Sequence, residues 1–228
     1  YSFIWNNVSC ATKGIRLQSM PEIVKPEERV NHVTIPGRSG EMTLKLLPEE
    51  ELDFIIGPPL FWSFHDKLGY DEATAERGVA LYREYYRPTG MWECAPYEGI
   101  PELLQSLHDA GVHLGVVTGK PEEFAQKLIR HFSLDHLFDF VVGISFTDKD
   151  ADKKALLERA FALAGLDKAT RRNAIMVGDR CFDIDGANDT GIDSLGVLYG
   201  FGSREELEGH GATLLADSAD GIRTLLLG

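Results

Sequence analysis

The chain has 228 residues, with 23 basic and 36 acidic side chains and a formal net charge of −13. This length suits one α/β core with a small second lobe, and the acidic excess argues against nucleic acid as the main partner. No run of 18 apolar residues occurs and the three cysteines lack metal-ligand spacing, which predicts a chain without a membrane span in a reducing, cytoplasmic setting.

Residues 1–47 are expected to hold one core strand followed by an unusual segment. The apolar side chains of Phe3, Ile4 and Trp5 fit a buried central strand, so residues 1–12 are assigned to the core. In residues 13–47, alternating apolar positions flank the sequence Pro36-Gly37-Arg38-Ser39-Gly40. That pattern predicts a β-hairpin or an extended loop.

Residues 48–90 have helical spacing without intervening β-rich runs. The helical stretches 49–54, 60–68 and 71–86 are separated by Gly57-Pro58-Pro59 and by Gly69. This segment is predicted to be a small helical lobe.

From residue 91 onward, short apolar runs alternate with helical periods. Helices are expected at 100–110, 121–131, 153–164, just after 183, from 204, and at the end of the chain, and strands at 112–117, 138–144, 174–177, 194–198 and around 214. Such alternation is typical of a parallel sheet covered by helices. Residues 91–228, together with 1–12, are therefore predicted to form an α/β core.

Two candidate phosphate-binding positions lie at a strand end and at a helix start. Thr118 and Gly119 follow a buried strand, where a hydroxyl and free backbone N–H groups can hold a phosphate oxygen, although a turn or cap residue is the ordinary role there. Lys153 begins a predicted helix, a place that is unfavourable to the helix dipole. It is either a solvated charge or compensated by an anion.

A candidate metal site follows the strand at 174–177. Asp179 comes directly after this strand and Asp183 is expected to open the next helix, so two carboxylates converge where Mg²⁺ can bind. The simpler role for Asp183 is a helix N-cap.

The chain resembles the haloacid dehalogenase superfamily, in particular its phosphoglycolate-phosphatase-like branch with a helical cap, over roughly residues 48–228. The resemblance rests on the segments at 54–60, 96–100, 117–124, 176–187, 191–192 and 196–203. It implies a Rossmann-like core with a cap formed by residues 48–90. It also implies that Thr118 binds the phosphoryl group, Lys153 neutralises charge, Asp179 binds Mg²⁺ and Asp183 supports it.

The same resemblance requires an Asp-x-Asp motif after the first strand, and this motif is missing. Asn7 stands where the nucleophile belongs and Ser9 where the acid/base belongs, and no aspartate precedes Asp53. An amide has no anionic oxygen to attack phosphorus, and a serine cannot relay protons as a carboxylate does. We therefore expect a scaffold for Mg²⁺-dependent hydrolysis of a small phosphorylated metabolite, as a monomer or homodimer, with impaired or no activity.

Two origins of this departure stay open. The N-terminal residues are either substitutions in a degenerate phosphatase, or a segment of different origin, because residues 3–40 also resemble the opening of phage distal-tail proteins. Functionally, a non-catalytic phosphate-binding protein is the alternative to an enzyme, and a structural tail component is a third hypothesis.

Overall fold

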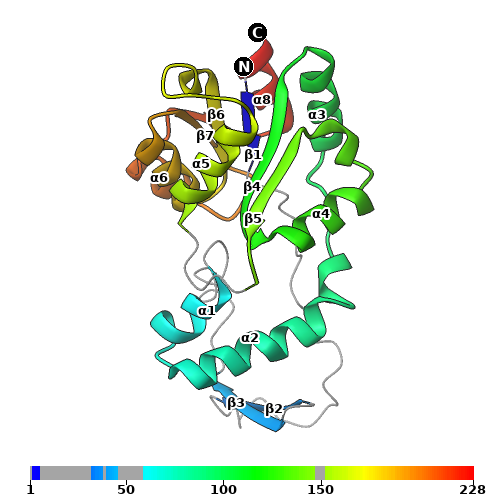
Figure 1. Ribbon diagram of the computed structural model, residues 1–228, viewed down its shortest axis with the longest axis vertical. Coiled ribbons are helices and arrows are strands. Elements are labelled where there is room, and N and C mark those ends of the chain that lie inside the picture. Colours follow the sequence, from blue (N-terminus) through cyan, green and yellow to red (C-terminus); the bar gives the residue numbers. More distant parts are fainter. Residues whose placement is uncertain (1, 6–31, 38–39, 46–58, 147–151) are drawn as a thin grey trace.

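The computed structural model describes residues 2–5, 32–37, 40–45, 59–146 and 152–228, with side chains for the last two ranges. Asn7 and Ser9 lie outside the described residues. Within these ranges, no helix is long and apolar enough to cross a membrane. The alternation of strands and helices produces an α/β fold with a parallel sheet, as the sequence predicts (Figure 1).

The core sheet has six parallel strands in the order β5-β4-β1-β6-β7-β8. The strands are β1 (Ser2–Trp5), β4 (His113–Pro121), β5 (Phe140–Ile144), β6 (Ala174–Gly178), β7 (Asp193–Val197) and β8 (Leu214–Ala216). The short β1 lies between β4 and β6, where Trp5 pairs with Val116 and Val177. The prediction that residues 3–5 occupy a central strand is confirmed.

Helices cover both faces of this sheet (Figure 1). The core helices are α3 (Ile100–Asp109), α4 (Glu122–His131), α5 (Lys153–Leu163), α6 (Cys181–Thr190), α7 (Arg204–Gly209) and α8 (Ala219–Leu227). Short 3₁₀ turns lie at η5 (Gly90–Trp92), η6 (Asp135–Leu137) and η7 (Arg171–Asn173). One apolar cluster joins α3 and α8 to the sheet, and a second joins α5 and α6 to it.

Helix α3 shows how the sequence directs this packing. Leu103, Leu104 and Leu107 share one face of the helix and are almost completely buried against the sheet. After the helix, Gly111 has a φ of +76°, a conformation that glycine adopts without steric cost. The chain then turns into β4.

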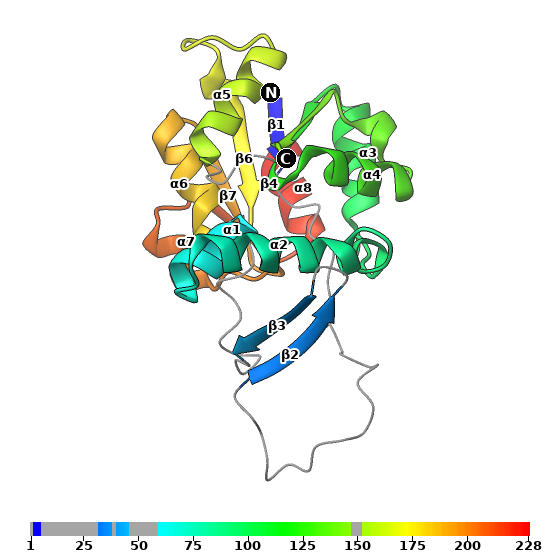
Figure 2. The same cartoon turned by 60° about the horizontal axis from the view of Figure 1, so that its bottom comes forward.

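The helical lobe lies at one end of the core (Figure 2). It contains α1 (Leu60–Trp62), the π-helical turn η4 (Ser63–Lys67) and α2 (Glu72–Tyr86). Asp71 caps α2 by accepting a hydrogen bond from the backbone N–H of Thr74 at 2.8 Å. The antiparallel pair β2 (His32–Gly37) and β3 (Gly40–Lys45) lies beyond α2, on the side away from the core (Figures 1 and 2).

Two predicted boundaries that bear on candidate residues are wrong. Strand β4 continues to Pro121, four residues beyond the predicted end at 117, so Thr118 and Gly119 lie within the strand. Helix α6 begins at Cys181, two residues before Asp183, which therefore occupies the third helical position. Arg180 is the N-cap residue, and its backbone N–H donates to Asp183 Oδ2 at 3.3 Å. The carboxylate acts from within the first turn, as in a capping box, and does not precede the helix.

Candidate functional site

Strands β4 and β6 each deliver a polar residue to the carboxyl edge of the sheet. Thr118 follows Val116 by two residues, Asp179 follows Val177 by two, and both valines pair with Trp5 of β1. Parallel strands end at the same edge, so these two side chains flank the end of β1.

Thr118 is buried in the last part of β4, and its Oγ1 accepts a hydrogen bond from the backbone N–H of Lys120 at 3.1 Å. The sequence predicts that free backbone N–H groups after Thr118 hold a phosphate oxygen, but the N–H group of Lys120 instead orients the threonine. A hydroxyl that accepts can also donate. The Thr118 hydroxyl, followed directly by Gly119, remains available as a donor to a ligand.

Lys153 lies at the first position of α5, and its ammonium group is compensated by a carboxylate. Its Nζ is 3.0 Å from Asp183 Oδ1 and 3.4 Å from the carbonyl oxygen of Val117. The side chain of Asp183 is completely buried and that of Lys153 is 12% exposed. The expected compensating anion is thus a carboxylate of the chain itself, and the alternative of a solvated charge is wrong.

Two glycines make room for this pair. A Cβ atom on Gly186 would lie 2.4 Å from Lys153 Cγ, and one on Gly178 would lie 2.3 Å from Asp183 Oδ2. Real Cβ contacts are essentially never that short. Only glycine at position 186 of α6 leaves space for the Lys153 side chain, and only glycine at position 178 of β6 leaves space for the Asp183 carboxylate.

Asp179 directly follows β6 and is held by the loop after β7. Its Oδ2 accepts from the backbone N–H of Phe201 at 2.8 Å, and its carbonyl oxygen accepts from the N–H of Gly202 at 2.9 Å. A Cβ atom on Gly200 would lie 2.2 Å from Asp179 Cβ, so the loop approaches closely only because glycine stands there. Asp179 is 4% exposed, and its position is fixed by backbone groups.

The charge of Asp179 affects the pKa values of two neighbouring tyrosines. Burial and the negative charge of Asp179 together raise the pKa values of Tyr97 and Tyr199 above the ordinary range. Their rings pack edge to face with centroids 5.0 Å apart. Reasoning from the sequence assigned no role to either tyrosine, although both lie in segments that carry the resemblance, 96–100 and 196–203.

Of the two candidate metal ligands, only Asp179 is compatible with a cation, and that cation would have to keep most of its water. Within the described residues, no group of three or more His, Cys, Asp or Glu side chains could hold a metal ion. Mg²⁺ is commonly bound through one or two carboxylates together with water and substrate phosphates, so a single fixed carboxylate such as Asp179 is compatible with it. Asp183 is committed to Lys153 and to the backbone of Arg180.

Cys181, the first residue of α6, is a free thiol between Asp179 and Asp183 in the sequence. Burial, followed by a hydrogen bond to Glu206, raises the pKa of the Cys181 thiol to about 11. The thiolate is the reactive form of cysteine, so at neutral pH this side chain is protonated and unreactive.

A family profile and individual relatives agree on what this chain is similar to. The sequence profile of the haloacid dehalogenase-like hydrolases matches residues 36–197. The chain is 38% identical over 175 residues to a 5′-nucleotidase of Pseudomonas aeruginosa, covering 77% of this chain and 78% of that protein. It is 28% identical over 207 residues to a phosphoglycolate phosphatase of Vibrio vulnificus, covering 90% and 89% of the two chains.

Solved structures agree with this comparison. A crystal structure of a predicted phosphatase from Clostridium acetobutylicum superposes with a TM-score of 0.75 at 38% identity, covering 81% of this chain and 84% of that one. The α/β fold with a Rossmann-like parallel sheet is thus shared with a structure of clear sequence similarity.

Proposed function

Because the chain belongs to the haloacid dehalogenase-like hydrolase family, we propose that its site binds the phosphoryl group of a small phosphomonoester together with Mg²⁺. The observation that carries this proposal is the buried Lys153–Asp183 pair. It places an ammonium group beside the carbonyl oxygen of Val117, the residue before Thr118, at the edge where Asp179 is also held.

Each of these groups has a defined chemical task. An ammonium group has three donors, and the described contacts of Lys153 use two of them, which leaves one for a phosphoryl oxygen. The Thr118 hydroxyl supplies a second donor. Asp179 would hold Mg²⁺, and the metal would supply positive charge that lowers the repulsion between an anionic ester and an attacking anion. Asp183 orients Lys153 and does not contact the substrate.

We further propose that turnover is impaired or absent. Formation of an aspartyl-phosphate needs a carboxylate after β1, and the sequence has Asn7 and Ser9 there. Loss of the acid/base group alone removes a contribution of roughly 10²–10⁴ in rate. The chain would then be a phosphate-binding protein on a phosphatase scaffold.

A phosphatase assay tests the catalytic part. With Mg²⁺ and 4-nitrophenyl phosphate, the wild-type chain should show no turnover above that of Asp179→Ala. Robust turnover that Asp179→Ala abolishes would disprove the inactive assignment. The double substitution Asn7→Asp with Ser9→Asp separates the two origins: gained activity supports a degenerate site, and no gain in a folded variant supports a foreign N-terminal segment.

Thermal unfolding tests the binding part independently of activity. Inorganic phosphate with Mg²⁺ at about 100 times its Kd should stabilise the wild-type chain by about 2.7 kcal/mol. Asp179→Asn should lose most of the Mg²⁺-dependent part of this stabilisation. An unchanged unfolding temperature of the wild-type chain over millimolar phosphate would contradict the binding role.

A further inference from the structure

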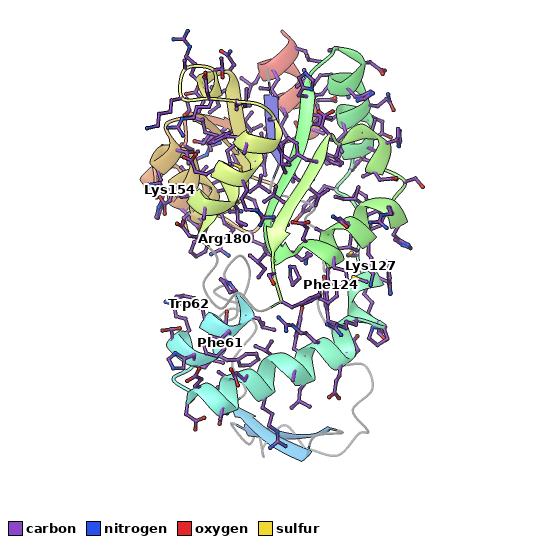
Figure 3. All side chains as sticks on the ribbon, viewed as in Figure 1. Phe61, Trp62, Phe124, Lys127, Lys154 and Arg180 are labelled. Atoms are coloured by element: carbon purple, nitrogen blue, oxygen red, sulfur yellow. The ribbon has the colours of Figure 1, made fainter. Side chains whose placement is uncertain are left out.

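Glu206, in the first turn of α7, contacts the two residues that follow Asp179. Its Oε1 accepts from the backbone N–H of Cys181 at 2.8 Å and from Nε of Arg180 at 2.9 Å. Arg180 directly follows Asp179, at the end of the core that faces the helical lobe (Figure 3), and Cys181 begins α6. One carboxylate oxygen of α7 therefore holds the chain where it leaves the candidate metal ligand.

The loop that leads into α7 holds Asp179 itself. The backbone N–H of Phe201 donates to the Asp179 carboxylate, and the N–H of Gly202 donates to its carbonyl oxygen. A Cβ atom on Gly202 would clash with that carbonyl oxygen, so the close approach of the loop requires glycine. Residues 201–206 thus contact the chain at Asp179 and again at the two residues after it.

The ion pair of Glu206 and Arg180 is largely withdrawn from water. The Arg180 side chain is 11% exposed and that of Glu206 is 26% exposed. Burial acts to raise the pKa of Glu206, but the hydrogen bonds from Cys181 and Arg180 outweigh it and the pKa lies below its ordinary value. By contrast, Glu208 of the same helix is 55% exposed and pairs with Arg204 on the surface.

We propose that Glu206 is a positioning residue of the metal site, which fixes the backbone after Asp179 and so keeps the Asp179 carboxylate where it can bind Mg²⁺. This inference rests on the proposed function. Removing a group that orients a metal ligand without touching the metal typically weakens metal binding by about 10–100-fold. Because Arg180 offsets the charge of Glu206, the role depends on the reach of the Glu206 side chain more than on its charge.

Binding of Mn²⁺, which prefers oxygen ligands as Mg²⁺ does, tests this role without requiring turnover. Electron paramagnetic resonance of the full chain with inorganic phosphate measures the free ion and gives the Kd. Glu206→Asp keeps the charge but is one carbon shorter, so it should lose contact with Cys181 or Arg180 and bind Mn²⁺ about tenfold more weakly. Glu206→Gln keeps the length and an acceptor oxygen, and should stay within about threefold of the wild-type chain.

The order of these two variants decides between reach and charge. An equal or larger loss in Glu206→Gln would show that the charge matters, and would overturn the positioning role. A lower unfolding temperature of Glu206→Asp with an unchanged Kd for Mn²⁺ would also overturn it, since the contact would then be structural only. Glu208→Asp is the matched control, because it shortens an exposed acid of the same helix and should leave the Kd unchanged. An equal loss there would overturn the role in favour of a general disturbance of α7.

The failure of this role and the failure of the proposed function give different results. If Asp179→Ala abolishes Mn²⁺ binding while Glu206→Asp binds as the wild-type chain does, only the positioning role is wrong. If Asp179→Ala and the wild-type chain bind Mn²⁺ equally, Asp179 is not the metal ligand. The metal part of the proposed function is then wrong, and the role of Glu206 falls with it.

Discussion

Lys153 and Lys120 both bring a positive charge toward the carboxyl edge of the central strands, but the structure compensates them differently. Lys153 lies 3.0 Å from the completely buried Asp183 carboxylate, whereas Lys120 contacts the hydroxyl and ring of Tyr86 and no carboxylate among the described residues. A buried charge needs a partner in the folded chain itself. One lysine is thus held by a buried carboxylate, while the other is held by a neutral hydroxyl and an aromatic ring.

The largest effect is expected from breaking the Lys153–Asp183 pair. Asp183→Ala leaves the Lys153 ammonium without its anion in a site that is 12% exposed, and should lower the free energy of unfolding by about 3–5 kcal/mol. Urea unfolding followed by circular dichroism measures this loss. The exposed pair of Arg204 and Glu208 is the control: Glu208→Ala should cost less than about 1 kcal/mol.

A double variant sharpens this first test. Lys153→Met combined with Asp183→Leu removes both charges and replaces them with apolar volume, so it should be more stable than Asp183→Ala alone. If the single and double variants lose equal stability, the loss comes from packing and not from the unpaired charge. Charge compensation would then not explain how Lys153 differs from Lys120.

A smaller loss of stability is expected from adding a methyl group beside the Lys153 side chain. In Gly186→Ala the new Cβ would lie 2.4 Å from Lys153 Cγ, so the lysine must shift away from Asp183. We expect a loss of about 1–3 kcal/mol in thermal or urea unfolding. Gly209→Ala is the matched control, since Gly209 is also helical and a Cβ there meets nothing within 4 Å. A neutral Gly186→Ala would show that the lysine stem is free to move.

Local patterns predicted most of the core, since the spacing of apolar residues carries that information. The shared face of Leu103, Leu104 and Leu107 is sufficient to predict α3. The sequence pattern predicts the start of α6 two residues late, because capping depends on the backbone geometry around Arg180. Sequence spacing alone could not show that the carboxylate of Asp183 acts from the third helical position.

The candidate site was predicted only in part, for a related reason. The unfavourable position of Lys153 at a helix start indicated that an anion should compensate it, yet nothing local pointed to Asp183, thirty residues further on. The contact between Lys120 and Tyr86 spans 34 residues and joins two different lobes. Contacts of this kind depend on how the elements pack together, and a single sequence carries no periodic signal for them.

The smallest effect on stability is expected at Lys120. Lys120→Met breaks one hydrogen bond to the Tyr86 hydroxyl and leaves no carboxylate unpaired, so the free energy of unfolding should fall by no more than about 1 kcal/mol. Lys153→Met should cost more in the same urea titration, because it leaves the buried Asp183 carboxylate without its cation. If the order were reversed, Lys120 would be the lysine on which the fold depends, and the buried carboxylate partner of Lys153 would not explain the difference between the two lysines.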